Sequence, residues 1–156
     1  MSAHGAHGAH AGRSLNRTAF SATAHCLSGC AVGEVLGMVI GTSLGWGEGG
    51  TIALAVVLAF FFGYSFTMVP LLRSGLSLRE AVPVALAADT ISIAIMETVA
   101  NALMLVIPGA MDAGLGELLF WGSLAISLLV AGAIAFPVVR WLIARGRGHA
   151  VVHAHH

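Results

Sequence analysis

The sequence alternates between long apolar segments and short breaks that are polar or rich in glycine. A helix that crosses ~30 Å of hydrocarbon needs about 20 residues, because each residue advances it by about 1.5 Å. Apolar segments of this length occur four times, at residues 24–44, 51–72, 81–107 and 118–141. The breaks between them carry turn-forming glycine and proline. The pattern therefore predicts an all-α membrane protein, a bundle of four transmembrane helices.

Composition agrees with a membrane environment and excludes other classes of protein. Hydrophobic residues make up 58% of the chain and charged residues 9%, with a mean hydropathy of +0.92. A soluble domain of this size has a large surface relative to its volume and could not cover it with so few charged side chains. The formal net charge is +0, so the chain has no excess of basic residues with which to bind a nucleic acid backbone.

The predicted organisation is one transmembrane domain, residues 24–142, between two tails. Residues 1–23 are rich in His, Gly and Ala, and residues 143–156 are rich in Arg and His. Low-complexity tracts of this kind are typical of disorder and bind divalent metal ions weakly, so we expect disordered tails that either collect metal or have no role. The histidines of the tails are His4, His7, His10, His149, His153, His155 and His156.

The distribution of charge predicts the orientation in the membrane. The basic residues are all arginines, and they lie before the first apolar segment, in the second break, and at or beyond the end of the fourth segment. The first and third breaks carry acidic residues instead, namely Glu48, Asp112 and Glu117. Because arginine and lysine favour the cytoplasmic side, this distribution predicts that both termini and the second break are cytoplasmic.

Two repeats of four residues mark the first apolar segment. One stripe along this helix consists of Cys26, Cys30, Glu34 and Met38, and His25 stands beside its start. The adjacent stripe consists of Gly29, Gly33, Gly37 and Gly41. Residues four apart lie on one helix face, and a glycine face lets another backbone approach closely. We expect a close helix contact at the glycines, and this face is also a candidate contact for a homo-oligomer.

The third segment places two carboxylates in the membrane, Asp89 and Glu97, followed by Asn101. An Asp at the centre of a membrane helix costs about 2.5–3.5 kcal/mol, and such residues nearly always face the interior of the bundle. Counting residues from the predicted cytoplasmic ends places Glu34 and Asp89 at similar depth, so we expect them to meet. The same count places Met68 near the level of the two cysteines.

These side chains form a predicted metal site. Thiolate, thioether and imidazole groups select soft ions such as monovalent copper, or zinc. The residues expected to bind the ion or to respond to it are His25, Cys26, Cys30, Met68, Glu34, Asp89 and Glu97. The predicted function is binding or transport of a soft metal ion, copper first and zinc next.

Two other functions remain open. Cys26 and Cys30 could cycle between dithiol and disulfide in a membrane oxidoreductase, although residues four apart on a regular helix are poorly placed for a bond between them. The chain could also be a scaffold without chemistry that packs against partner membrane proteins. The sequence contains neither a Ser/His/Asp arrangement nor a phosphate-binding loop in its usual context, so we do not expect an enzyme.

The motif from His25 to Cys30, read with Asp89-Thr90-Ile91-Ser92 and Met96-Glu97, resembles a known family. This is a family of small bacterial membrane proteins with an HCxxGC signature, a domain of unknown function numbered 4396. The resemblance covers roughly residues 25–141. It implies a multi-pass protein of the bacterial inner membrane with the signature residues as its site, and it implies no particular activity.

Overall fold

The structure, a computed structural model, consists of four long helices. It describes the backbone of residues 4–73 and 75–153, and the side chains of residues 12–69, 72–73, 75–80, 82–83, 86–87 and 89–145. The helices are α1 (His4–Ser43), α2 (Glu48–Arg73), α3 (Leu78–Val106) and α4 (Leu118–His153). No strand occurs in the described part of the chain, and the predicted all-α bundle is confirmed.

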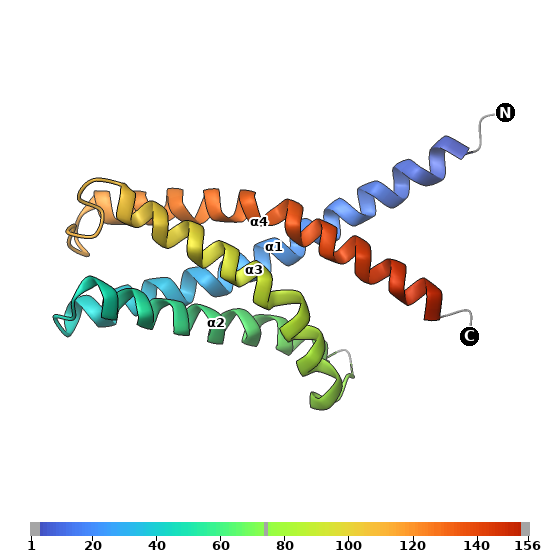
Figure 1. Cartoon of the computed structure of the whole chain (residues 1–156), viewed down its shortest axis with the longest axis horizontal. Helices are drawn as coiled ribbons and strands as arrows, with labels where there is room; N and C mark the ends of the chain where they lie inside the picture. Colours follow the sequence, from blue (N-terminus) through green and yellow to red (C-terminus); the bar gives the residue numbers. More distant parts are fainter. Residues whose placement is uncertain (1–3, 74, 154–156) are drawn as a thin grey trace.

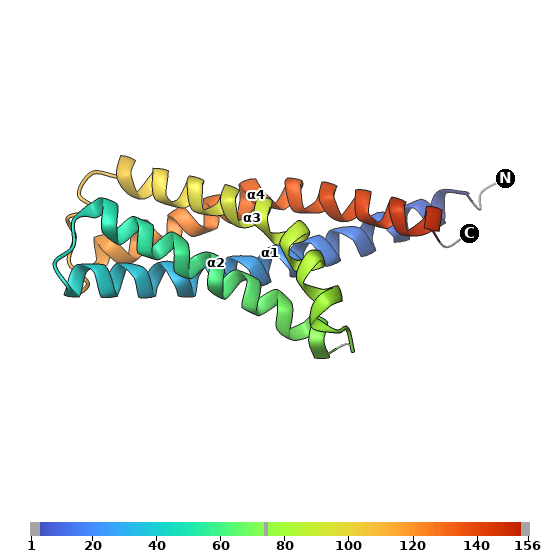
Figure 2. The ribbon, with the colours of Figure 1, turned by 60° about the horizontal axis from the view of Figure 1, so that its bottom comes forward.

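The helices run up and down along one long axis (Figures 1 and 2). The α1–α2 and α3–α4 connections lie together at one end, which we call the loop end. The start of α1, the end of α4 and the α2–α3 connection lie toward the opposite end, which we call the terminal end. There, the end of α2 and the first part of α3 turn away from α1 and α4 (Figure 1).

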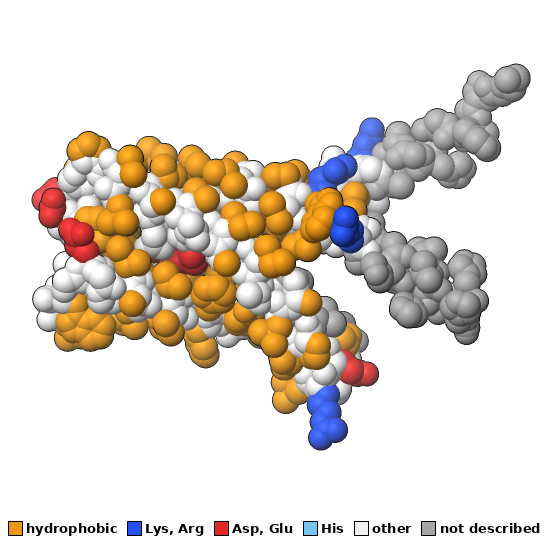
Figure 3. All heavy atoms as spheres, in the orientation of Figure 1, with side chains coloured by type: hydrophobic (Ala, Val, Ile, Leu, Met, Phe, Trp, Pro, Cys, Tyr) orange, Lys and Arg blue, Asp and Glu red, His pale blue; other side chains and the backbone are white. Residues whose placement is uncertain are grey.

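Each helix contains a segment long and apolar enough to cross a membrane, and the chain is a multi-pass membrane protein. These segments are Gly12–Ser43, Glu48–Val69, Asp89–Val106 and Leu118–Arg145. The space-filling view shows a largely apolar body with its basic side chains toward the terminal end, and with acidic side chains at the loop end, midway along the body and beside the α2–α3 connection (Figure 3). Large apolar side chains such as Val57 and Phe61 are exposed because lipid surrounds them.

Two helices extend well beyond the predicted spans. α1 begins at His4 and α4 continues to His153, so most of the two segments predicted as disordered tails is helical. Extending an existing helix is much easier than nucleating one, and the alanines and arginines of these segments are good helix formers. The side chains of the tail histidines lie outside the described residues, so their metal-collecting role stays a prediction.

The glycine face of α1 packs against α2. A Cβ atom at Gly33 or Gly37 would overlap the backbone of Ala59 or Ala55, and one at Gly29 would lie 2.7 Å from the Cα atom of Gly63. The predicted close contact is therefore confirmed. Because α2 of the same chain covers this face, it is not open to a second copy, which corrects the expected homo-oligomer contact.

Two apolar clusters form the interior of the bundle. The thiol cluster consists of Cys26, Cys30, Ala59, Ile93, Met96, Ala100, Ala131 and Ala135. The methionine cluster lies nearer the loop end and consists of Met38, Met104, Ala110, Ala113, Phe120 and Leu124. Since α1 contacts all three other helices, side chains on its inner face reach both clusters.

The α1–α2 contact yields a stability prediction. Gly33→Ala places a methyl group against the backbone of Ala59 and should destabilise the fold by about 1–3 kcal/mol, the usual cost of overpacking. Gly122→Ala is the matched control, because a Cβ atom at this helical glycine meets nothing within 4 Å. We expect a lower denaturation midpoint in detergent for Gly33→Ala only, and equal midpoints for the two variants would contradict the close contact.

Candidate functional site

Polar side chains of the membrane segments gather inside the bundle. Glu34 is 0% exposed, Glu97 3%, and Asp89 and Asn101 are each 8% exposed. In Figure 3, acidic side-chain atoms are partly visible midway along the bundle, between apolar side chains. Carboxylates are costly in hydrocarbon, so their burial away from lipid is the expected solution.

The two thiols of α1 lie in the centre of the thiol cluster. Cys26 and Cys30 are free cysteines and both are buried. The thiol of Cys30 interacts with that of Cys26 and with the carboxyl group of Glu97, which comes from α3. Met96, adjacent to Glu97 in sequence, belongs to the same cluster and is fully buried. The structure thus brings two thiols and one thioether together from two helices.

The carboxyl group of Glu34 lies near that of Glu97 rather than near Asp89. Glu34 is nine residues before Ser43, the last residue of α1, and Glu97 is nine residues before Val106, the last residue of α3. Counting from the loop end therefore gives the correct pairing. Counting from the terminal end failed because α1 is longer than predicted and the first part of α3 turns away from the bundle.

Asn101 holds Glu97 in place. The side-chain amide of Asn101 donates to the backbone carbonyl of Glu97 at 2.9 Å and to its Oε2 atom at 3.3 Å. The other carboxylate oxygen of Glu97, both oxygens of Glu34 and the side-chain oxygen of Asn101 are buried without a hydrogen-bond partner. Such groups are rare in proteins because each loses its water without replacement.

Sequence reasoning missed Ser127 of α4, whose hydroxyl group is also buried and without a partner. The signal was present in the fourth segment, where Ser123, Ser127, Ala131 and Ala135 recur every four residues. A stripe of small residues marks a face that packs closely against neighbouring helices. A serine in such a stripe is placed inside the bundle, at the level of the other polar groups.

Asp89 belongs to a different contact, between α2 and α3. Its side chain interacts with Thr67 of α2, and its Oδ2 atom has no hydrogen-bond partner. In the next residue, the hydroxyl of Thr90 lies 2.7 Å from that of Tyr64. Asp89 is eight residues nearer the terminal end than Glu97 on the same helix, which is about 12 Å at 1.5 Å per residue.

The structure does not bring His25 and Met68 to the thiols. His25 is exposed, because successive residues turn by about 100° around a helix and the face of Cys26 is the inner one. Met68 is half-buried on α2 and belongs to neither apolar cluster. Met96, which the sequence places beside Glu97, is the methionine that shares the thiol cluster.

No three His, Cys, Asp or Glu side chains in the described part of the chain lie close enough together to hold a metal ion. A site with three protein ligands at the thiols would therefore need a ligand of another type. The thioether of Met96 is the sulfur ligand available in the same cluster.

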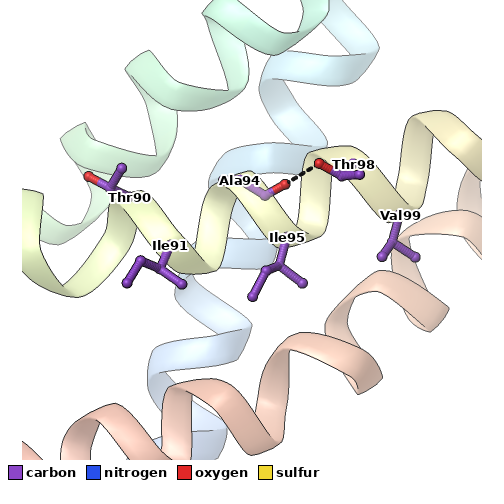
Figure 4. Close-up of a pocket in the computed structure, with 6 residues that line it drawn as sticks. All are labelled: Thr90, Ile91, Ala94, Ile95, Thr98 and Val99. Carbon is purple, nitrogen blue, oxygen red and sulfur yellow. Dashed lines mark hydrogen bonds between the residues drawn. The ribbon is translucent and has the colours of Figure 1, made fainter.

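A groove of about 420 Å³ lies on the outer side of α3 and is separate from these polar groups. Figure 4 shows its lining residues, Thr90, Ile91, Ala94, Ile95, Thr98 and Val99. The hydroxyl of Thr98 donates to the backbone carbonyl of Ala94 at 2.7 Å, and that of Thr90 to Leu86 at 2.6 Å. The threonines thus satisfy their own polar groups, and the groove offers apolar contacts to lipid.

Comparison with known proteins gives a family and no activity. No curated protein and no solved structure matches the chain. Residues 15–148 match the family described as "Domain of unknown function (DUF4396)", and this range includes all the buried polar groups described above. Because the match covers most of the chain, this protein belongs to the DUF4396 family.

Proposed function

We propose that this protein binds a soft metal ion, monovalent copper in first place and zinc in second, inside its transmembrane bundle. The ligands are the thiols of Cys26 and Cys30 and the thioether of Met96. One observation carries this proposal: two free, buried thiols interact with each other and share one buried cluster with the thioether of Met96. Sulfur ligands of these two kinds select monovalent copper over harder ions.

Helix geometry favours a bridging metal over a disulfide. Residues four apart on a helix have Cβ atoms about 5–6 Å apart. A disulfide needs Cβ atoms at about 3.5–4.5 Å, so it would require α1 to unwind. A metal that binds two thiolates at about 2.3 Å each holds the sulfur atoms up to ~4.6 Å apart. The regular helix therefore suits a shared metal ion better than a thiol–disulfide oxidoreductase.

The number of sulfur ligands favours copper over zinc. Structural zinc sites are almost always tetrahedral with four protein ligands, whereas monovalent copper binds at lower coordination numbers. Two thiols and one thioether share the cluster. Met38 and Met104 lie buried in the methionine cluster, so further thioethers are available toward the loop end for an ion that moves through the bundle.

The distribution of charge supports a location in the bacterial inner membrane with the terminal end in the cytoplasm. Arg73 and Arg79 flank the α2–α3 connection, and Arg140 and Arg145 lie in the last part of α4. These arginines mark the terminal end, as the positive-inside rule requires of a cytoplasmic side. In this orientation the thiol cluster lies nearer the cytoplasm than the methionine cluster.

Copper binding can be measured with purified protein whose thiols are kept reduced. We expect wild-type protein in detergent to take up stoichiometric monovalent copper from a chromophoric chelator. Cys26→Ser and Cys30→Ser each remove a thiolate ligand and should weaken binding at least ~10-fold, and Met96→Leu should weaken it less because a thioether carries no charge. His25→Ala and Met68→Leu are the controls and should bind as the wild type does, because both residues lie outside the thiol cluster. The proposal fails if the wild type retains neither copper nor zinc, or if both serine variants bind normally.

The oxidation state of the thiols separates metal binding from redox chemistry. Membranes are quenched in acid, and free thiols are then alkylated and counted by mass spectrometry. We expect Cys26 and Cys30 to be alkylated in nearly all molecules, because the helix disfavours a bond between them. A large disulfide fraction would instead support the oxidoreductase.

A further inference from the structure

A layer of polar side chains crosses the bundle between the two apolar clusters. Its members, which we call the oxygen layer, are Glu34 of α1, Glu97 and Asn101 of α3, and Ser127 of α4. All four are buried, with exposed fractions of 0%, 3%, 8% and 0%. The layer is built by three different helices.

The register of α1 and α4 places this layer between the clusters. On α1, Glu34 lies one turn from Cys30 of the thiol cluster and one turn from Met38 of the methionine cluster. On α4, Ser127 lies between Leu124 of the methionine cluster and Ala131 of the thiol cluster. Residues three or four apart share a helix face, so both side chains point toward the boundary.

The positions of the layer's residues on α3, and their distances from the helix ends at the loop end, place the layer at a similar level. On α3, Glu97 lies between Met96 and Ala100 at the edge of the thiol cluster, and Asn101 lies between Ala100 and Met104 of the methionine cluster. Ser127 is nine residues after Leu118, the first residue of α4, just as Glu34 and Glu97 are nine residues before their helix ends. At about 1.5 Å per residue, all three lie roughly 13 Å from the loop end.

Most oxygen atoms of the oxygen layer lack a hydrogen-bond partner. Five of its oxygen atoms are buried without a hydrogen-bond partner: Oε1 and Oε2 of Glu34, Oε1 of Glu97, Oδ1 of Asn101 and Oγ of Ser127. The side-chain amide of Asn101 is already used by Glu97. The arginines whose side chains are described are all exposed, and the chain contains no lysine, so none of these cations lies in the layer.

We propose that the oxygen layer binds a hard divalent cation, of the class of Mg²⁺, Mn²⁺ and Ca²⁺, at a site of oxygen ligands that adjoins the thiol cluster where Glu97 meets Cys30. Two neighbouring carboxylates and one divalent ion are together neutral, which suits a site surrounded by hydrocarbon. Carboxylate, amide and hydroxyl oxygens are the ligands that these ions prefer, at about six to eight per ion. The five unpartnered oxygens supply most of that set, and water supplies the rest.

Binding of Mn²⁺ to the full-length protein tests this site. The protein in detergent is titrated with Mn²⁺, and the free ion is followed by electron paramagnetic resonance. We expect saturable binding by the wild type, at least ~10-fold weaker binding by Glu34→Gln, and a smaller loss for Ser127→Ala. Glu34 is the sharper substitution because it is not in the thiol cluster, whereas Glu97 interacts with Cys30.

The matched control is Asp89→Asn, which changes the third buried carboxylate of the membrane segments and lies outside the layer. It should bind Mn²⁺ as the wild type does.

Thermal unfolding measured with and without Mn²⁺ separates lost binding from lost folding. A Glu34→Gln variant that is folded still unfolds at a defined midpoint, but addition of Mn²⁺ does not raise that midpoint as it does for the wild type. Absence of Mn²⁺ binding by the wild type, or equal binding by Glu34→Gln, would overturn the proposal. Cys26→Ser should keep Mn²⁺ binding, so a failure of the copper site and a failure of the oxygen layer can be told apart.

Discussion

The close contact between the α1 and α2 backbones fixes how the rest of the bundle is arranged. Glycines at four-residue intervals let α2 lie directly against one face of α1. Glu34 follows Gly33 and Cys30 follows Gly29, so the polar stripe is turned by about 100° from the glycine face. With α2 seated on the glycines, this stripe is directed toward α3 and α4. The positions of Cys30 and Glu34 therefore depend on the neighbouring glycines.

Polar groups in hydrocarbon must be satisfied by other groups of the protein, and the bundle sorts them by chemistry along its axis. Two thiols and a thioether lie in the thiol cluster, unpartnered oxygens lie in the next layer, and further thioethers follow toward the loop end. Glu97 connects the first two levels, because its carboxyl group interacts with Cys30 on one side and lies near Glu34 on the other. Soft and hard ions prefer different ligands, so neighbouring levels of one bundle can distinguish between them.

The sequence predicted the four helices and the close glycine contact because both follow from patterns within one helix. It was harder to predict which side chains of different helices lie close together, since this depends on where each helix ends in space. Glu34 was expected beside Asp89, yet it lies near Glu97, because the long α1 and the turned first part of α3 shift any count made from the terminal end. His25 was grouped with Cys26 because the two are adjacent in sequence, although adjacent residues on a helix face different directions.

Apolar side chains lie on both sides of the buried polar groups along the bundle axis. Between Asp89 and Glu97 on α3 stands Ile93, which is fully buried. A Cβ atom at Gly63 of α2 would lie 2.6 Å from the Cδ1 atom of Ile93, so only glycine allows the isoleucine to pack this closely. Toward the loop end, Met38, Met104 and the rest of the methionine cluster close the bundle. The contact between Ile93 and Gly63 thus separates Asp89 from Glu97, and it joins the two helices that turn away together at the terminal end.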